Sequence, residues 1–318
     1  MTNYIKPVKI RVDASTLCQL ECPLCPRAEL EKNLGLGFLK FNDFKNLVDA
    51  NPRVSDIELS SYGEIFLNPD LLEIIKYAYK KNVKLHADNG VNLNTASEEM
   101  LEALVKYKFN SLKCSVDGAN QETYSIYRKG GNFGKVIEHI KKINYYKSKY
   151  KSKFPLLTWQ FIIFGHNTHE IKAARQMAEG LKMLFRLRFS WDDTFSPVKD
   201  NDLVRQESGI GVSSRKEYLE KTGNDYVGKI CTQLWLQPQI NFDGKVLGCC
   251  VNYRGDFGNA FQEGLYECLN SEKMNYARQM LLGYKESRED IPCAACKYYG
   301  LRKKRAGWVT SADLGDSR

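Results

Sequence analysis

Short apolar segments alternate with longer amphipathic segments through the first two thirds of the chain. The short segments are rich in β-branched and aromatic residues, which is typical of strands. The longer ones repeat apolar residues at intervals of three and four, which is typical of helices packed on one face. Strands that alternate with helices predict βα units around a parallel sheet. The expected strands are residues 8–13, 56–61, 83–88, 111–116, 156–164 and 185–191.

Amphipathic helices are expected between these strands, and two of them begin with residues suited to a helix N-terminus. Asn68 stands before Pro69, and Thr168 stands before Glu170. Six βα units of this kind predict the α/β class, as a partial (β/α)6 TIM-like barrel. The expected helical segments are residues 41–50, 68–81, 96–107, 134–149 and 168–181.

The periodicity fades after residue 192 into a polar stretch with many turn-forming residues, which indicates a linker or lid. A small cysteine-rich module follows, beginning near Lys229. We therefore predict a barrel over residues 1–192, a linker or lid over 193–228, and a C-terminal module over 229–318.

Composition narrows the class of protein. The chain has 318 residues, of which 43% are hydrophobic, and no run approaches the roughly 20 apolar residues that a membrane span needs. We therefore expect a cytoplasmic location and no membrane partner. The net charge of +9 is concentrated in residues 141–153 and 302–305, which we interpret as a solvated helix face and a basic tail. Because no aromatic-basic RNA motif accompanies these runs, we expect no nucleic-acid partner.

Three of the ten cysteines, Cys18, Cys22 and Cys25, form a CxxxCxxC motif directly after the first expected strand. Three thiolates on one short loop can hold three irons of a 4Fe-4S cluster and leave the fourth iron open to a small molecule. A structural zinc site needs a fourth ligand, and no histidine lies near this loop in the sequence.

This loop resembles that of the radical S-adenosylmethionine (SAM) superfamily, and the resemblance covers most of residues 8–192. It implies a radical SAM enzyme in which the open iron binds the methionine part of SAM and an electron from the cluster produces a 5′-deoxyadenosyl radical. Leu24 departs from the family, which usually has an aromatic residue before the third cysteine.

The resemblance also implies cofactor contacts after the second and third strands. Gly63 and Glu64 stand where the family has Gly-Gly-Glu, with Tyr62 in place of the first glycine. Glu64 is therefore expected to accept hydrogen bonds from the methionine ammonium group. Asn89, with Gly90, is similar to a Thr-Asn-Gly turn near the bound cofactor.

Further contacts are implied after the fourth and fifth strands. Ser115 and Asp117 belong to a segment that resembles the Ser-x-Asp-Gly of the superfamily, and they are expected to meet the ribose. Arg128 is expected to bind the methionine carboxylate. His166 stands near the position where the family packs against adenine.

The C-terminal module contains a second set of cysteines, Cys231, Cys249, Cys293 and Cys296. The Asp243-Gly244 pair predicts a hairpin that brings Cys231 and Cys249 together. Spacing alone leaves a zinc site and a second 4Fe-4S cluster open. The module resembles the twitch form of the SPASM family, which implies one auxiliary 4Fe-4S cluster.

Cys250 is adjacent to one of these ligands and is an alternative to Cys249. Cys268 is expected to be a packing residue on a helix.

Together the two clusters imply a radical SAM oxidoreductase. An auxiliary cluster near the substrate can accept an electron from the substrate radical, so we expect oxidation of a sugar, cyclitol or other small metabolite, as in the radical alcohol dehydrogenases of this subgroup. The alternative is modification of a ribosomally made peptide by thioether formation, oxidation or epimerisation. Such enzymes often carry an N-terminal leader-binding domain, for which the position of Cys18 leaves no room.

The expected partners are a small-molecule or peptide substrate and an electron donor such as flavodoxin or ferredoxin. The sequence singles out no catalytic acid or base. Candidates for substrate contact, by position at strand ends, are Tyr62, Gln160, Arg188, Trp191 and Asp192.

Overall fold

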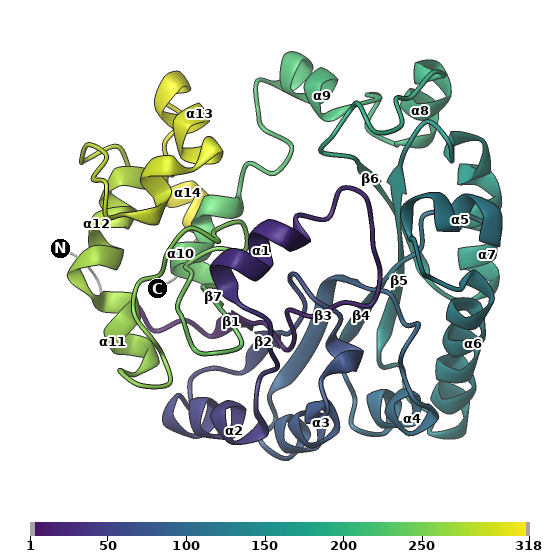
Figure 1. Ribbon diagram of the computed structural model, residues 1–318, viewed down its shortest axis with the longest axis horizontal. Coiled ribbons are helices and arrows are strands. Elements are labelled where there is room, and N and C mark those ends of the chain that lie inside the picture. The colour runs from purple at the N-terminus through teal and green to yellow at the C-terminus, as the bar shows by residue number, and fades with distance from the viewer. Residues whose placement is uncertain (1–3, 316–318) are drawn as a thin grey trace. The chain divides into compact units, whose positions relative to one another are not determined.

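A computed structural model describes residues 4–315 and confirms the α/β class. The strands form an open seven-stranded sheet of the partial-barrel type, in the order β6-β5-β4-β3-β2-β1-β7 (Figure 1). Parallel pairing joins β1 to β2 and to β7, β3 to β4, β4 to β5, and β5 to β6. The strands are β1 (Lys9–Val12), β2 (Asp56–Glu58), β3 (Lys84–Val91), β4 (Ser111–Ser115), β5 (Leu156–Ile163), β6 (Leu184–Phe189) and β7 (Gln239–Ile240).

The helices that connect the first six strands bury the apolar positions on which the sequence prediction depended. In α3, Leu71, Ile74, Ile75 and Ala78 are buried, at the expected spacings of three and four. The helices up to β6 are α1 (Arg27–Leu34), α2 (Phe41–Ala50), α3 (Leu71–Lys80), α4 (Glu98–Lys106), α5 (Gln121–Tyr127), α6 (Phe133–Lys149) and α7 (Ile171–Gly180), with 3-10 turns η1 (Ile65–Leu67) and η2 (Thr168–Glu170).

The expected caps at Asn68 and Thr168 are wrong. Helix α3 begins one residue after Asp70, and the Asn68 side chain donates instead to the Ala14 and Leu39 carbonyl oxygens, at 2.7 and 2.9 Å. Thr168 lies inside η2, because a 3-10 turn precedes α7. In both places the polar residue belongs to a short segment that precedes the helix. The local sequence does not predict the structure of that segment.

The segment between β6 and the C-terminal module is partly helical. Residues 193–228, which the sequence indicated as a linker or lid, contain α8 (Asn201–Glu207) and α9 (Arg215–Thr222), capped by Asp200 and Ser214. The C-terminal elements are η3 (Ile230–Thr232), α10 (Gln233–Leu236), α11 (Leu265–Asn270), α12 (Glu272–Leu281), η4 (Pro292–Ala295), α13 (Lys297–Arg305) and α14 (Ser311–Leu314).

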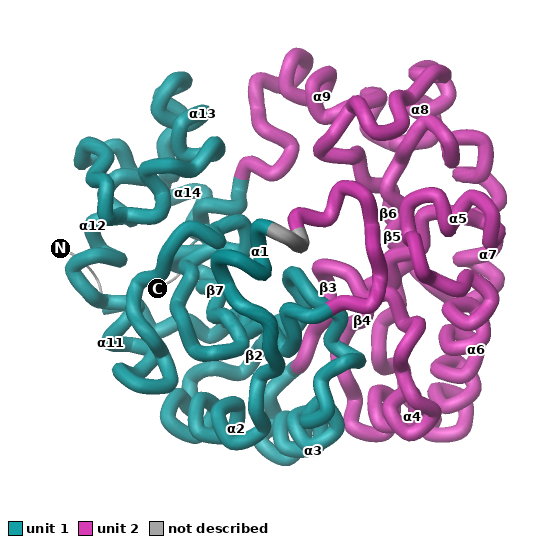
Figure 2. The backbone as a smooth tube through the Cα atoms, viewed as in Figure 1, with its two compact units in different colours: residues 1–17, 27–84, 229–318 teal, residues 18–26, 85–228 magenta. Residues whose placement is uncertain are grey.

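The chain divides into two compact units (Figure 2). Unit 1 comprises residues 1–17, 27–84 and 229–318, and unit 2 comprises residues 18–26 and 85–228. The C-terminal module therefore belongs to the same unit as β1 and β2, and the cysteine loop belongs to the same unit as β4, β5 and β6.

The sheet of unit 2 has two faces of different character. Register pairs Lys113 with Thr158 and Ser115 with Gln160, and it pairs Thr158, Gln160 and Ile162 of β5 with Leu184, Arg186 and Arg188 of β6. Registered neighbours point to the same side of a sheet. We call this side the polar face of unit 2; it comprises Lys113, Ser115, Thr158, Gln160, Ile162, Leu184, Arg186 and Arg188.

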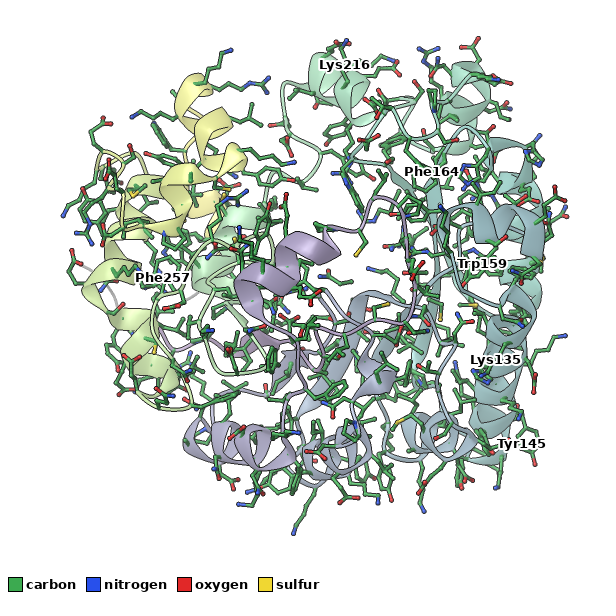
Figure 3. All side chains as sticks on the ribbon, viewed as in Figure 1. Lys135, Tyr145, Trp159, Phe164, Lys216 and Phe257 are labelled. Carbon is green, nitrogen blue, oxygen red and sulfur yellow. The ribbon has the colours of Figure 1, made fainter. Side chains whose placement is uncertain are left out.

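The opposite side of the same strands is apolar and faces the helices. Trp159 and Phe161 are fully buried there, and the Trp159 Nε1–H donates to the Val116 carbonyl oxygen at 2.7 Å (Figure 3). The Arg175 guanidinium of α7 lies over the Phe185 ring of β6, 5.0 Å from its centroid. The strand alternation in the sequence therefore directs the polar residues to the other face.

Unit 1 carries a buried polar row across β7, β1 and β2. Arg11 is in register with Glu58 on one side and with Gln239 on the other. The Arg11 side chain donates to Gln239 Oε1 at 2.8 Å, and Glu58 Oε1 accepts from the Ser60 N–H, also at 2.8 Å. Strand β7 was not expected, because two residues are too few to show a sequence pattern.

Asp13 extends this row by two residues, and its carboxyl group is fully buried. Neither carboxyl oxygen has a hydrogen-bond partner among the described residues. Burial raises the pKa of Asp13 from 3.8 to about 8, while the Arg11 charge opposes the rise. The Gln239 side chain and the Tyr62 N–H also lower this pKa without reaching hydrogen-bonding geometry.

None of the helices within residues 4–315 combines the length and the apolar character needed to cross a membrane.

The buried Asp13 makes stability depend on pH. Between pH 6 and pH 8 the unfolded chain has lost the proton, whereas the native carboxyl still holds it until the pH approaches its pKa of about 8. The native state therefore binds more protons, and its free energy of unfolding falls as pH rises, by up to roughly 1.4 kcal/mol per pH unit. Asp13→Asn is expected to remove this slope, as measured by urea unfolding at both pH values. An equal slope in the variant would show that Asp13 is ionised in the native state.

Candidate functional site

The cysteine loop lies in unit 2, where two nitrogen donors approach its sulfur atoms. Asn92 Nδ2 lies 3.7 Å from Cys18 Sγ, and Arg128 Nη1 lies 3.6 Å from Cys22 Sγ. The Cys25 N–H donates to the Cys22 carbonyl oxygen at 3.0 Å, which tightens the loop between these two cysteines. Donors that point at sulfur stabilise the negative charge of thiolates and of an iron-sulfur cluster. These surroundings fit the cluster that the spacing predicts.

Asn92 was missed in the sequence, although it follows the Asn89-Gly90 pair by two residues. Its side chain is held by Gln19, whose Nε2 donates to Asn92 Oδ1 at 2.7 Å. The contact joins residues 73 positions apart in the chain. Sequence alone offers no signal for it beyond the position of Asn92 at the end of a strand.

Arg128 is held in place by a buried ion pair. Its Nε lies 2.6 Å from Asp117 Oδ2, and the other oxygen of Asp117 accepts the Ile162 N–H, also at 2.6 Å. Burial lowers the pKa of Arg128, but the negative charge of Asp117 and the smaller contributions of Cys22, Tyr127 and Tyr124 together outweigh this and hold the pKa well above its ordinary value. Asp117 therefore positions Arg128 beside Cys22, and its expected contact with the ribose stays a prediction.

Gly90 and Ser115 meet on the polar face of unit 2. Gly90 has a φ of +124°, and a Cβ atom there would lie 2.3 Å from Ser115 Oγ. Gln160 Nε2 would lie 3.5 Å from the same point. Glycine is thus required at residue 90, and β3 has an irregular register between Ala87 and Val91 that exposes Asn89. The roles of Ser115 and Asn89 in cofactor binding stay predictions.

His166 belongs to an aromatic group near the cysteine loop. Its ring stacks on Phe164 at a centroid distance of 5.3 Å and meets Phe195 edge-on. Its Nδ1 lies 2.9 Å from Ser196 Oγ, and burial lowers the pKa of His166, which favours the neutral ring. Leu24 packs against the same apolar cluster. A neutral imidazole among aromatic rings suits a flat, uncharged ligand such as a purine.

The expected Gly-Gly-Glu segment lies in unit 1. A Cβ atom on Gly63 would lie 2.2 Å from the Ser15 carbonyl oxygen, and the Glu64 N–H donates to the Leu17 carbonyl oxygen at 2.7 Å. Glu64 is buried, and one of its carboxylate oxygens caps η1 by accepting the Phe66 N–H. This segment therefore supports the backbone that leads directly into Cys18.

The Tyr62 side chain contacts the C-terminal module, and its expected contact with the cofactor stays a prediction. Its hydroxyl donates to the Cys250 carbonyl oxygen, and its ring packs beside Leu30, Leu34 and Leu247. Burial raises the pKa of Tyr62 well above its ordinary range. Tyr62 thus connects the loop after β2 to the segment that contains Cys249 and Cys250.

The four cysteines of the second set are linked by pairwise electrostatic interactions within unit 1. Cys249 interacts electrostatically with Cys231 and Cys293, and Cys293 interacts with Cys231 and Cys296. Burial, followed by the charge of neighbouring thiols, raises the pKa of Cys293 to about 12 and that of Cys249 well above its ordinary value. Metal binding deprotonates such thiols.

The hairpin expected at Asp243-Gly244 is present between Cys231 and Cys249. Ile240 and Val246 form an antiparallel bridge, the Gly244 N–H donates to the Asn241 carbonyl oxygen at 3.0 Å, and Gly244 has a φ of +91°. Glycine suits this turn because, without a Cβ atom, it adopts a positive φ at little steric cost.

Cys250 is adjacent to Cys249 and interacts electrostatically with it. Burial raises the pKa of Cys250, and Arg11, Gln233 and Asp13 also modify it. Cys268 is buried in α11. Cys249 also interacts with Cys231 and Cys293, and its assignment as the fourth ligand stays a prediction.

Within residues 4–315, no three His, Cys, Asp or Glu side chains are arranged to hold a single metal ion.

Two protein families match this chain. The radical SAM superfamily matches residues 13–177, and the iron-sulfur cluster-binding domain of the SPASM family matches residues 231–297. The second match decides between the two alternatives for the C-terminal cysteines in favour of an iron-sulfur cluster. The cofactors are therefore 4Fe-4S clusters and SAM.

Curated relatives are distant. The AdoMet-dependent heme synthase of Methanosarcina barkeri is 27% identical over 57% of this chain, and this chain spans about half (49%) of its length. The subtilosin biosynthesis protein AlbA of Bacillus subtilis is 23% identical over 99% of this chain and 74% of its own.

Solved structures share the fold at low identity. SuiB of Streptococcus suis with bound S-adenosylmethionine matches 93% of this chain and 72% of its own, with a TM-score of 0.64 and 13% identity. The structure of anSMEcpe with AdoMet and a Cp18Cys peptide matches 98% and 92%, with a TM-score of 0.61 and 16% identity. BtrN with AdoMet and 2-DOIA matches 92% and 93%, with a TM-score of 0.52 and 14% identity.

Gly63→Ala is expected to release the cysteine loop. The new methyl group would overlap the Ser15 carbonyl, and the backbone that leads to Cys18 would have to move. We expect less iron bound per chain after anaerobic reconstitution. The control is Gly180→Ala at the end of α7, where nothing lies within 4 Å of the added Cβ. Equal iron content in both variants would contradict the close approach at Gly63.

The assignment of the fourth auxiliary ligand can be tested with neighbouring residues. Cys249→Ala is expected to reduce the iron content of the reconstituted protein from about eight to about four per chain, whereas Cys250→Ala is expected to retain about eight. The reverse result would show that Cys250 binds the cluster.

Proposed function

The chain belongs to the radical S-adenosylmethionine superfamily, and from this membership we propose that it cleaves SAM reductively and oxidises its substrate with the help of an auxiliary 4Fe-4S cluster. When bound, the first cluster supplies the electron that yields the 5′-deoxyadenosyl radical, which abstracts hydrogen from the substrate. The observation that carries the proposal is the pair of donors, Asn92 and Arg128, on the sulfurs of Cys18 and Cys22.

The residues of this chain hold and orient the cofactors. Cys18, Cys22 and Cys25 are proposed to bind the SAM cluster, and Cys231, Cys249, Cys293 and Cys296 to bind the auxiliary one. The electrostatic interactions among the cysteines of the second set support a fully ligated cluster. A cluster without an open iron can accept an electron but cannot bind SAM, and this favours an oxidative outcome.

The side chains that the sequence singled out are suited to the parts of SAM. Glu64 is proposed to accept the methionine ammonium, Arg128 to pair with its carboxylate, and Ser115 with Asn89 to meet the ribose. The neutral ring of His166 is proposed to lie against adenine. Each role matches the charge or the hydrogen-bonding capacity of the side chain.

The substrate of the proposed oxidation is a sugar, cyclitol or other small metabolite. Similarity to BtrN, whose structure contains 2-DOIA, supports this class. Peptide modification is the second candidate, supported by similarity to AlbA along 99% of the chain and to SuiB, which has been solved with its precursor peptide SuiA. An electron donor such as flavodoxin or ferredoxin is proposed for either reaction.

SAM cleavage tests the proposal. After anaerobic reconstitution and reduction, the wild-type protein is expected to bind about eight irons and to produce 5′-deoxyadenosine from SAM. Cys22→Ala is expected to abolish production, and Cys268→Ala, which alters a buried packing residue, is the control. Equal production by Cys22→Ala would contradict the enzyme proposal, and four irons with one zinc would contradict the auxiliary cluster. Loss of two hydrogens from a metabolite or from a peptide, measured by mass spectrometry, separates the two substrate classes.

A further inference from the structure

Two arginines at the edge of unit 2 have no counter-charge among the described residues. Arg186 and Arg188 are exposed on β6, and no ion pair or side-chain hydrogen bond joins either of them to another of the described residues. Other arginines of this unit are paired: Arg128 with Asp117, Arg175 with Glu207 at 2.9 Å, and Arg205 with Glu217 at 2.9 Å. Arg186 and Arg188 therefore have their guanidinium groups available for a ligand.

Both side chains belong to the polar face of unit 2. The neighbour of Arg186 in the register is Gln160, which itself is paired with Ser115, and the neighbour of Arg188 is Ile162. Phe185, which precedes Arg186 on β6, lies on the opposite face, under the Arg175 guanidinium of α7. The arginines thus share a face with Ser115, a residue proposed to bind SAM.

The cysteine loop packs on the same part of the sheet. Cys22 and Leu24 lie against the cluster formed by Tyr127, Ile162 and Phe164. Arg188 is one strand away from Ile162, and neighbouring strands lie about 4.8 Å apart. An arginine side chain is long enough to span that interval, so its guanidinium can contact a molecule held beside the cysteine loop.

We propose that Arg186 and Arg188 bind a carboxylate or phosphate group of the substrate. The proposal rests on the proposed function, because it places the ligand beside the radical-generating site. A guanidinium presents paired N–H donors that match two oxygens of an oxyanion, and two such groups on one strand form a strong anion site. Their exposure means that no buried counter-ion has to be displaced when the ligand binds.

Edge protection is the competing explanation for these charges. Strand β6 is a terminal strand of the sheet, and charged residues on such strands oppose pairing with another molecule. This explanation requires no ligand. It predicts that neutral variants self-associate and that wild-type protein shows no anion binding at this face.

The test is calorimetric titration of the reconstituted protein, with SAM present in excess to fill the cofactor site. The probes are inorganic phosphate, for small anionic metabolites, and an acetylated tetraglutamate peptide, for acidic peptides. The variants are Arg186→Gln, Arg188→Gln and the double variant. The control is Arg305→Gln, which removes an exposed guanidinium from α13 in unit 1.

Each single variant is expected to bind the preferred probe at least tenfold more weakly, and the double variant more weakly still, because a charge-assisted hydrogen bond is lost with each guanidinium. Arg305→Gln is expected to bind like the wild type. A preference for phosphate indicates a small anionic metabolite, and a preference for the peptide indicates an acidic peptide.

Several results would overturn the proposal. They are the absence of binding by the wild type, an equal loss in Arg305→Gln, and weaker binding of SAM rather than of the probe in the β6 variants. Self-association of the variants without a change in anion affinity would favour edge protection. Because the titration does not require SAM cleavage, failure of the proposed function and failure of this inference are distinguishable.

Discussion

The buried ion pair between Asp117 and Arg128 is the interaction on which the arrangement of unit 2 depends. It joins the end of β4 to the residue that ends α5, and through the Ile162 N–H it joins both to β5. A buried carboxylate with no partner would be costly, so these residues must stay together. The same geometry directs Arg128 toward Cys22. This ion pair therefore holds the end of β4 and the end of α5 together. It also places the positive charge of Arg128 beside the cysteine loop.

The two faces of the sheet in unit 2 differ in character: one packs against the helices, and the other carries the polar side chains. The apolar face buries Trp159 and Phe161 against the helices and supplies packing energy. Because side chains alternate along a strand, the same packing directs Gln160 and the β6 arginines to the opposite face. The orientation of the polar face thus follows from the burial of the residues on the other face.

In unit 1, long-range side-chain hydrogen bonds connect the strands to the segments that carry the cysteines. Tyr62 and Arg11 connect the β1 and β2 region to the C-terminal segment, the first through the Cys250 carbonyl and the second through Gln239. These contacts join residues 188 and 228 positions apart. The C-terminal module is therefore built onto the strands at the beginning of the chain, and the sheet gains β7 from it.

The sequence by itself determined the α/β class, the six longer strands, the hairpin at Gly244 and the two cysteine sets, because periodicity, turn residues and ligand spacing are local properties. Tertiary structure alone decided that Asn92 lies beside Cys18 and that the Tyr62 hydroxyl is bonded to the Cys250 carbonyl. It also decided that Asn68 and Thr168 do not cap the N-termini of α3 and α7. The physical reason is that each of these outcomes depends on groups far apart in the chain, whose approach is set by the packing of the whole core.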